Sequence, residues 1–204
     1  MEKIKDKVIE IVSNEYEVLN RIYFVLVREG YKHARGDVFY IPFGSGLEIQ
    51  YKLDISDLSY GCNVIVTEKI LENLDLDKEK VIDIAYTNTY TKHPYLFESF
   101  DEILPALPIP VDIDIPMFVL TNTSKTFGAG TILYPGMKEK LESILGDFIV
   151  IPSSVHETII FPDFGNNEGI ANIIKEINAT VVAEEEVLAD VPFKLLGDKN
   201  LIAV

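Results

Sequence analysis

The fold is indicated most clearly by residues 38–53, which read Val38-Phe39-Tyr40-Ile41-Pro42-Phe43-Gly44-Ser45-Gly46-Leu47-Glu48-Ile49-Gln50-Tyr51-Lys52-Leu53. Two runs rich in aromatic and branched residues flank a Gly-Ser-Gly turn, and the second run alternates apolar with polar residues. Such alternation is typical of a strand that buries one face, and the glycines favour a tight connection between two strands. We therefore predict a β-hairpin over this stretch.

The residues before the hairpin have a different period. Between residues 4 and 27 the apolar side chains recur every three or four positions, which indicates amphipathic helix. Ser13 and Asn14 interrupt this pattern, and either side chain could cap a second helix. We predict one helix or two over residues 4–27, with Gly30 as the stop signal.

After the hairpin, Thr67 can cap a helix over residues 68–74, and a second helix is predicted over residues 78–91, before Pro94. Residues 104–110 contain three prolines, which exclude a helix or a central strand, so an extended connector is expected there.

The second half alternates short strands with amphipathic helices. Strands are predicted over residues 117–122, 130–134, 147–151 and 158–161, and helices over residues 138–145 and 169–177. This succession favours an α+β fold, with helices packed on a mixed or antiparallel sheet and a helical segment at the N-terminus. We expect residues 1–204 to form a single α+β domain, which could be sub-divided into residues 1–103 and 117–204.

Composition excludes several classes of protein. The chain has 204 residues, 33 Asp and Glu against 18 Lys and Arg, a net charge of -15 and a single cysteine, Cys62. One cysteine allows neither an intrachain disulfide nor a Cys-based zinc site. No apolar run reaches the roughly 18 residues of a membrane helix, and no secretory signal is evident, so a soluble cytoplasmic protein is expected. The negative field opposes direct binding to nucleic acid.

Chemistry is best supported around Ser154, His156 and Glu157. His156-Glu157 is the one place where histidine stands directly beside a carboxylate, and Ser154 lies two positions earlier, on the same face of an extended chain. These types predict a catalytic cluster in which His156 acts as base and Glu157 orients it. The competing interpretation is a turn followed by the start of a strand.

Metal and cofactor sites find no support in the sequence. A zinc motif of the H-E-x-x-H type is excluded because Ile160 stands where its second histidine belongs. His33 and His93 are expected on the surface, His93 as a favourable cation at a helix C-terminus. We predict no cofactor and no bound metal.

A resemblance to a known family is carried by six segments, residues 66–74, 117–122, 127–130, 148–157, 176–180 and 186–190. They resemble a bacterial domain-of-unknown-function family, number fifty-six eighty-eight, over roughly the last two thirds of the chain, from Cys62 to Asp190. Its most specific element is Pro152-Ser153-Ser154-Val155-His156-Glu157, whereas Ala189 departs from the serine typical of the family. The resemblance supports the fold expected for the second half and implies no activity, ligand or catalytic residue.

Three functions remain open from the sequence. The first is a non-enzymatic interaction or regulatory protein, and its charge favours a basic protein as partner. The second is a hydrolase that uses Ser154, His156 and Glu157. The third is an acidic mimic of nucleic acid that inhibits a basic partner, which would require its acids to line one face. The oligomeric state is not indicated.

Overall fold

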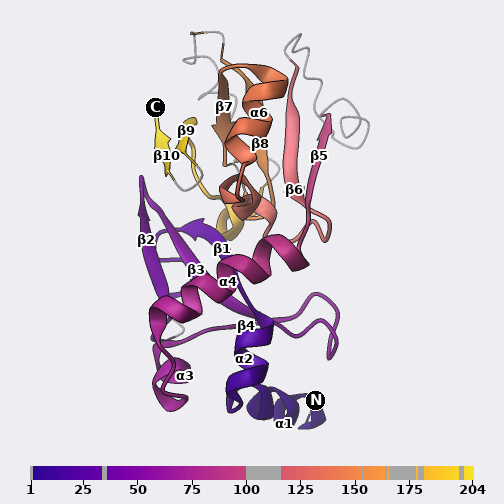
Figure 1. Cartoon of the computed structure of the whole chain (residues 1–204), viewed down its shortest axis with the longest axis vertical. Coiled ribbons are helices and arrows are strands. Elements are labelled where there is room, and N and C mark those ends of the chain that lie inside the picture. The colour runs from indigo at the N-terminus through magenta and orange to yellow at the C-terminus, as the bar shows by residue number, and fades with distance from the viewer. Residues whose placement is uncertain are drawn as a thin grey trace. The chain divides into compact units, whose positions relative to one another are not determined.

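The computed structural model describes residues 2–33, 36–99, 116–152, 154–163, 165, 178, 182–197 and 200–204. The chain divides into two compact units, unit 1 formed by Met1–Phe43 and Leu47–Pro94 and unit 2 by Gly44–Gly46 and Tyr95–Val204. Each unit contains helices and a sheet whose described pairings are antiparallel, which confirms the α+β prediction (Figure 1).

Unit 1 begins with two short helices, α1 (Glu2–Val12) and α2 (Glu15–Arg21). The Asn14 side chain accepts a hydrogen bond from the Glu17 N–H at 3.1 Å, so Asn14 caps α2 as predicted. The helix prediction is wrong beyond Arg21, because residues Ile22–Arg28 form strand β1. Those residues are almost all apolar, and an uninterrupted apolar run does not distinguish a buried strand from a buried helix by its period.

The predicted hairpin is present as β2 (Tyr40–Gly44) and β3 (Leu47–Asp54). The sheet has the order β1-β3-β2, and the short strand β4 (Asn63–Ile65) also pairs with β3. In the register of β1 against β3, Ile22 lies opposite Leu53 and Arg28 opposite Leu47.

Two predicted helices follow, α3 (Glu68–Asn73) and α4 (Lys78–Lys92). Thr67 caps α3, as predicted, by accepting a hydrogen bond from the Ile70 N–H at 3.3 Å. Helix α4 packs on β1 (Figure 1). The Phe24 and Tyr86 rings stack there with centroids 5.5 Å apart. The Phe24 N–H also donates to the buried Thr89 hydroxyl at 2.9 Å. This contact joins the last turns of α4 to the sheet.

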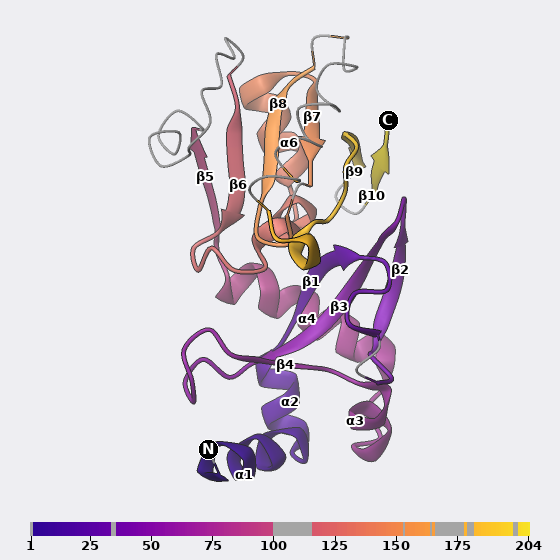
Figure 2. The same cartoon turned by 180° about the vertical axis from the view of Figure 1, so that it is seen from behind.

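Unit 2 is built on a six-stranded sheet in the order β10-β9-β7-β8-β6-β5 (Figure 2). Its strands are β5 (Tyr95–Ser99), β6 (Phe118–Asn122), β7 (Phe148–Ile151), β8 (Thr158–Pro162), β9 (Phe193–Gly197) and β10 (Asn200–Ala203). Strands β6, β7 and β8 confirm predictions, whereas β5, β9 and β10 were not predicted. The expected connector over residues 104–110 and the expected helix over residues 169–177 lie outside the described residues.

One predicted strand of unit 2 is a 3₁₀ helix instead. Residues Gly128–Leu133 form η3, and all six are buried. The Thr131 hydroxyl donates to the Gly128 carbonyl at 2.7 Å, one turn back along the chain, a bond that accompanies the helical bend where a strand was predicted. The next helix, α6 (Met137–Leu145), confirms its prediction and ends at Gly146, whose φ of 70° suits glycine.

Candidate functional site

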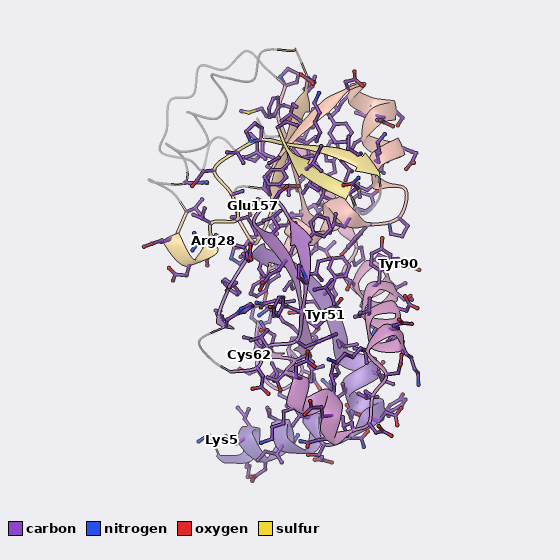
Figure 3. The ribbon with its side chains drawn as sticks, turned by 90° about the vertical axis from the view of Figure 1, so that its left-hand side faces the viewer. Lys5, Arg28, Tyr51, Cys62, Tyr90 and Glu157 are labelled. Carbon is purple, nitrogen blue, oxygen red and sulfur yellow. The ribbon has the colours of Figure 1, made fainter. Side chains whose placement is uncertain are left out.

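Ser154, His156 and Glu157 lie in the turn between β7 and β8. The turn is attached to the 3₁₀ helix η4 (Glu184–Glu186), because the Val155 N–H donates to the carbonyl of Glu186, the last residue of η4, at 2.8 Å. Ser154 also forms an isolated bridge with Val187. Glu157, labelled in Figure 3, stands immediately before β8. Main-chain bonds therefore fix where these three side chains lie.

Ser154 is only 3% exposed, and its hydroxyl is fully engaged with its neighbours. It donates to the Glu157 carboxylate at 2.6 Å and accepts from the His156 N–H at 3.0 Å. A serine nucleophile donates its proton to the base that activates it. In this turn the group that receives the proton is a carboxylate, and the bond to His156 comes from the backbone.

The His156 imidazole is held by a different pair of groups. Its Nδ1 accepts from the Phe127 N–H at 3.2 Å, and its Nε2 lies 3.2 Å from a carboxylate oxygen of Glu186. Because Nδ1 accepts, the hydrogen-bond pattern assigns the proton of the neutral ring to Nε2, which donates to Glu186. The His156 carbonyl accepts from the Thr121 hydroxyl at 2.7 Å. His156 thus connects the starts of η3 and β8 with η4.

The structure brings the three predicted residues close together, but Ser154 pairs with Glu157, whereas His156 pairs with a fourth residue, Glu186. We call this set the His156 junction. Its geometry matches a turn followed by the start of a strand. The catalytic role of the cluster stays a prediction, and it would require the His156 ring to leave Phe127 and approach the Ser154 hydroxyl.

Sequence reasoning missed a cleft in unit 1. It has a volume of about 310 Å³ and lies where α2, β3 and α4 end, so its residues are far apart in the sequence. We call it the His93 cleft. It is lined by Asn20, Arg21, Ile22, Asp54, Ser56, Asp57, Lys92 and His93.

Arg21 forms one wall of the His93 cleft. Its guanidinium binds both carboxylate oxygens of Asp57, at 2.7 and 3.0 Å, and its Nε binds Glu17 at 2.8 Å. It also donates to the Asp54 carbonyl at 3.1 Å. The hydrogen bonds to Asp57 and Glu17 raise the pKa of Arg21, and the bond to Arg21 lowers the pKa of Asp57. Because the planar guanidinium binds both carboxylate oxygens of Asp57, this wall of the cleft is held in one orientation.

His93 caps the C-terminus of α4 and is half-buried, which corrects the expectation of a surface cation there. Its ring lies against Tyr23, with centroids 4.9 Å apart. Burial lowers the pKa of His93 by disfavouring the charged ring, the Asp54 carboxylate opposes this effect, and the Lys92 ammonium adds to it. The ring is therefore neutral at pH 7.

His33 is also half-buried, with its Nε2 2.8 Å from a carboxylate oxygen of Glu48, so it too departs from the surface position expected. Within the described ranges, no three His, Cys, Asp or Glu side chains converge as a metal site would require. In the same part of the chain, no helix combines the length and the apolar character needed to cross a membrane.

The acidic segments that could mimic nucleic acid fall in different units. Asp77 caps α4 by accepting from the Lys80 N–H at 2.8 Å, and Glu79 lies in the first turn of that helix, so both have a local role in unit 1. Glu184, Glu185 and Glu186 lie in unit 2. Residues 95–204 contain 17 Asp and Glu against six Lys and Arg, whereas residues 1–94 contain 16 against 12. The excess of acid belongs mainly to unit 2.

Comparison with known families gives one match, to a family of unknown function, over residues 2–194. The chain belongs to the DUF5688 family. The match spans nearly the whole sequence, so the resemblance seen from Cys62 to Asp190 was too short and the N-terminal helices are part of DUF5688. No curated protein and no solved structure matches the chain. Membership of DUF5688 assigns no reaction and no ligand.

Proposed function

We propose that this DUF5688 protein is a bacterial, cytoplasmic, non-enzymatic interaction or regulatory protein whose second unit binds a basic protein. The observation that supports this function best is the hydrogen bond from the Ser154 hydroxyl to Glu157 rather than to His156. In a hydrolase that used this cluster, the Ser154 hydroxyl would instead donate to His156, its base.

A hydrolytic mechanism would need three features that the His156 junction does not combine. The nucleophile must reach a substrate, yet Ser154 is 3% exposed. The base must present an unprotonated nitrogen to the hydroxyl, yet His156 Nδ1 accepts from the Phe127 N–H. The orienting carboxylate must hold the base, yet Glu157 holds the serine. This arrangement supports a structural role for the junction.

The charge of unit 2 supports the choice of partner. With 17 acidic against six basic residues, its sequence produces a field that attracts a basic surface and repels nucleic acid. Glu184 and Glu185 are exposed on η4, where they can meet a partner. Exposed charges act on association mainly through long-range attraction that salt screens, so binding should weaken as salt concentration rises.

The interaction is tested with purified tagged protein and lysate of its host, at about 50 mM and about 500 mM salt. We expect a basic protein to be retained at low salt and released at high salt. The double variant Glu184→Gln, Glu185→Gln should retain less of it, while the charge-matched control Glu72→Gln, Asp83→Asn in unit 1 should retain as much as wild type. Equal retention by both variants would contradict a role for η4.

The non-enzymatic part is tested with His156→Ala and Ser154→Ala on a panel of activated esters. We expect no hydrolysis above that of buffer by wild type, and lower thermal stability in both variants because each loses bonds of the junction. Hydrolysis that disappears in His156→Ala at unchanged thermal stability would instead establish the hydrolase. If duplex DNA displaced this protein from the basic partner, the nucleic-acid mimic would be favoured, since DNA and this protein would then bind the same surface of the partner.

A further inference from the structure

The His93 cleft contains two charges that its own contacts do not neutralise. Among the described residues, the Asp54 carboxylate forms no ion pair, and the Lys92 ammonium binds only the carbonyl and side-chain oxygens of Asn20. Arg21 and Asp57, by contrast, neutralise one another. Asp54, Lys92 and His93 line the same cleft, and both charges act on the pKa of His93.

We propose that the His93 cleft binds a small zwitterion of the free α-amino acid class, with its ammonium group at Asp54 and its carboxylate at Lys92. This site is independent of the partner proposed for unit 2, because every lining residue belongs to unit 1. It would make the protein a sensor of a small metabolite.

The balance of charge selects this ligand class. An inorganic anion such as phosphate would meet Lys92 but would also face the unneutralised carboxylate of Asp54. A polyamine would meet Asp54 but would also face the Lys92 ammonium. A neutral sugar would leave both uncompensated charges without a counter-charge, whereas a zwitterion neutralises both at once. The neutral His93 ring repels neither end of such a ligand.

The size and rigidity of the cleft agree with this class. A volume of about 310 Å³ stands at the small end of ligand pockets, which suits a molecule of amino-acid size. The Asp54 carboxylate is oriented by the Ser56 N–H at 2.8 Å, and Lys92 is held by Asn20. Groups that are already oriented lose little freedom when a ligand binds, which favours affinity.

The test is thermal unfolding of the full-length chain with each standard L-amino acid at about 5 mM, followed by calorimetric titration of those that stabilise it. We expect at least one amino acid to raise the melting temperature by about 3 °C at roughly ten times its Kd. Its N-acetylated amide, which has neither charge, should produce no shift, and neither should glucose or inorganic phosphate.

Two variants assign the binding to the cleft. Asp54→Asn and Lys92→Met should each weaken the amino acid at least about tenfold, because each removes one charge-assisted contact. Asparagine can still accept the Ser56 N–H, so Asp54→Asn keeps the local turn, and circular dichroism checks both folds. The exposed controls Asp83→Asn and Lys69→Met should bind as wild type does.

The proposal is overturned if no amino acid shifts the melting temperature of wild type. It is equally overturned if both cleft variants bind as tightly as wild type, or if the acetylated amide, glucose or phosphate binds as well as the amino acid.

Discussion

Replacing Gly128 with alanine tests whether the His156 junction holds unit 2 together. A Cβ atom at this position would stand 2.6 Å from the Asn122 backbone nitrogen and 2.6 Å from the His156 carbonyl oxygen, and still closer to the Thr121 hydroxyl oxygen. Real Cβ atoms essentially never approach other atoms this closely, and two of the three neighbours are backbone. The added methyl group must therefore displace β6 or the turn before β8.

The magnitude follows from the contacts that have to change. Overpacking a well-packed site costs about 1–3 kcal/mol. Moving Thr121 also breaks its hydrogen bond to the His156 carbonyl, which adds about 1 kcal/mol. We expect Gly128→Ala to lower the free energy of unfolding by about 2–4 kcal/mol.

Urea unfolding followed by circular dichroism and by tyrosine fluorescence measures this loss, because the chain contains ten tyrosines and no tryptophan. Gly197→Ala is the matched control: nothing lies within 4 Å of its added Cβ, and its backbone is not in the left-handed region, so little change is expected. Adding Thr121→Ala should recover part of the loss, since it removes the nearest obstacle. If Gly128→Ala unfolds within about 0.5 kcal/mol of Gly197→Ala, the packing argument is refuted.

Two further predictions concern unit 1. Because burial lowers the pKa of His93, the unfolded chain binds a proton near pH 6.5 more readily than the folded chain does, so stability is lost as pH falls below that value. The unfolding free energy of His93→Gln, measured between pH 7 and about pH 5, should therefore decline less than that of wild type. Parallel curves for the two proteins would contradict the lowered pKa. Thr89→Val removes the buried hydroxyl that accepts a hydrogen bond from the Phe24 N–H, so it should lower the free energy of unfolding in urea by about 1–3 kcal/mol. The control Thr91→Val, at an exposed position, should lower it by less than about 0.5 kcal/mol. Equal losses of stability in the two variants would show that the Thr89 hydroxyl contributes little.

Local signals in the sequence predicted local structure well. Asn14 and Thr67 cap helices where their side chains were expected to do so, and Gly146 ends α6. The prediction failed for residues 22–28, where an apolar run is buried in a sheet by pairing with residues far along the chain. It failed again for η3, because the bend depends on Thr131 and on the tight fit of Gly128.

The candidate sites likewise depend partly on local sequence and partly on contacts between distant segments. Nearness in sequence brought Ser154, His156 and Glu157 to attention, but the partners of His156 are Phe127 and Glu186, which come from other segments. Spacing therefore indicated the residues and not their pairing. The His93 cleft had no signal at all in the sequence, because it depends on how residues 20–22, 54–57 and 92–93 meet in the fold.

The strand order of unit 2 has a consequence for how fast it folds. Strand β7 pairs with β8 through a short turn, so Ile151 meets Ile159, whereas β7 also pairs with β9, where Val150 meets Phe193 across a much longer loop. Closing long loops costs more chain entropy, and contacts distant in sequence slow folding. We expect the β7–β8 hairpin to form early and β9 late. The turn that Ser154 and Glu157 close would then already be formed when β9 docks, so kinetic measurements on Ser154→Ala should show slower refolding rather than faster unfolding.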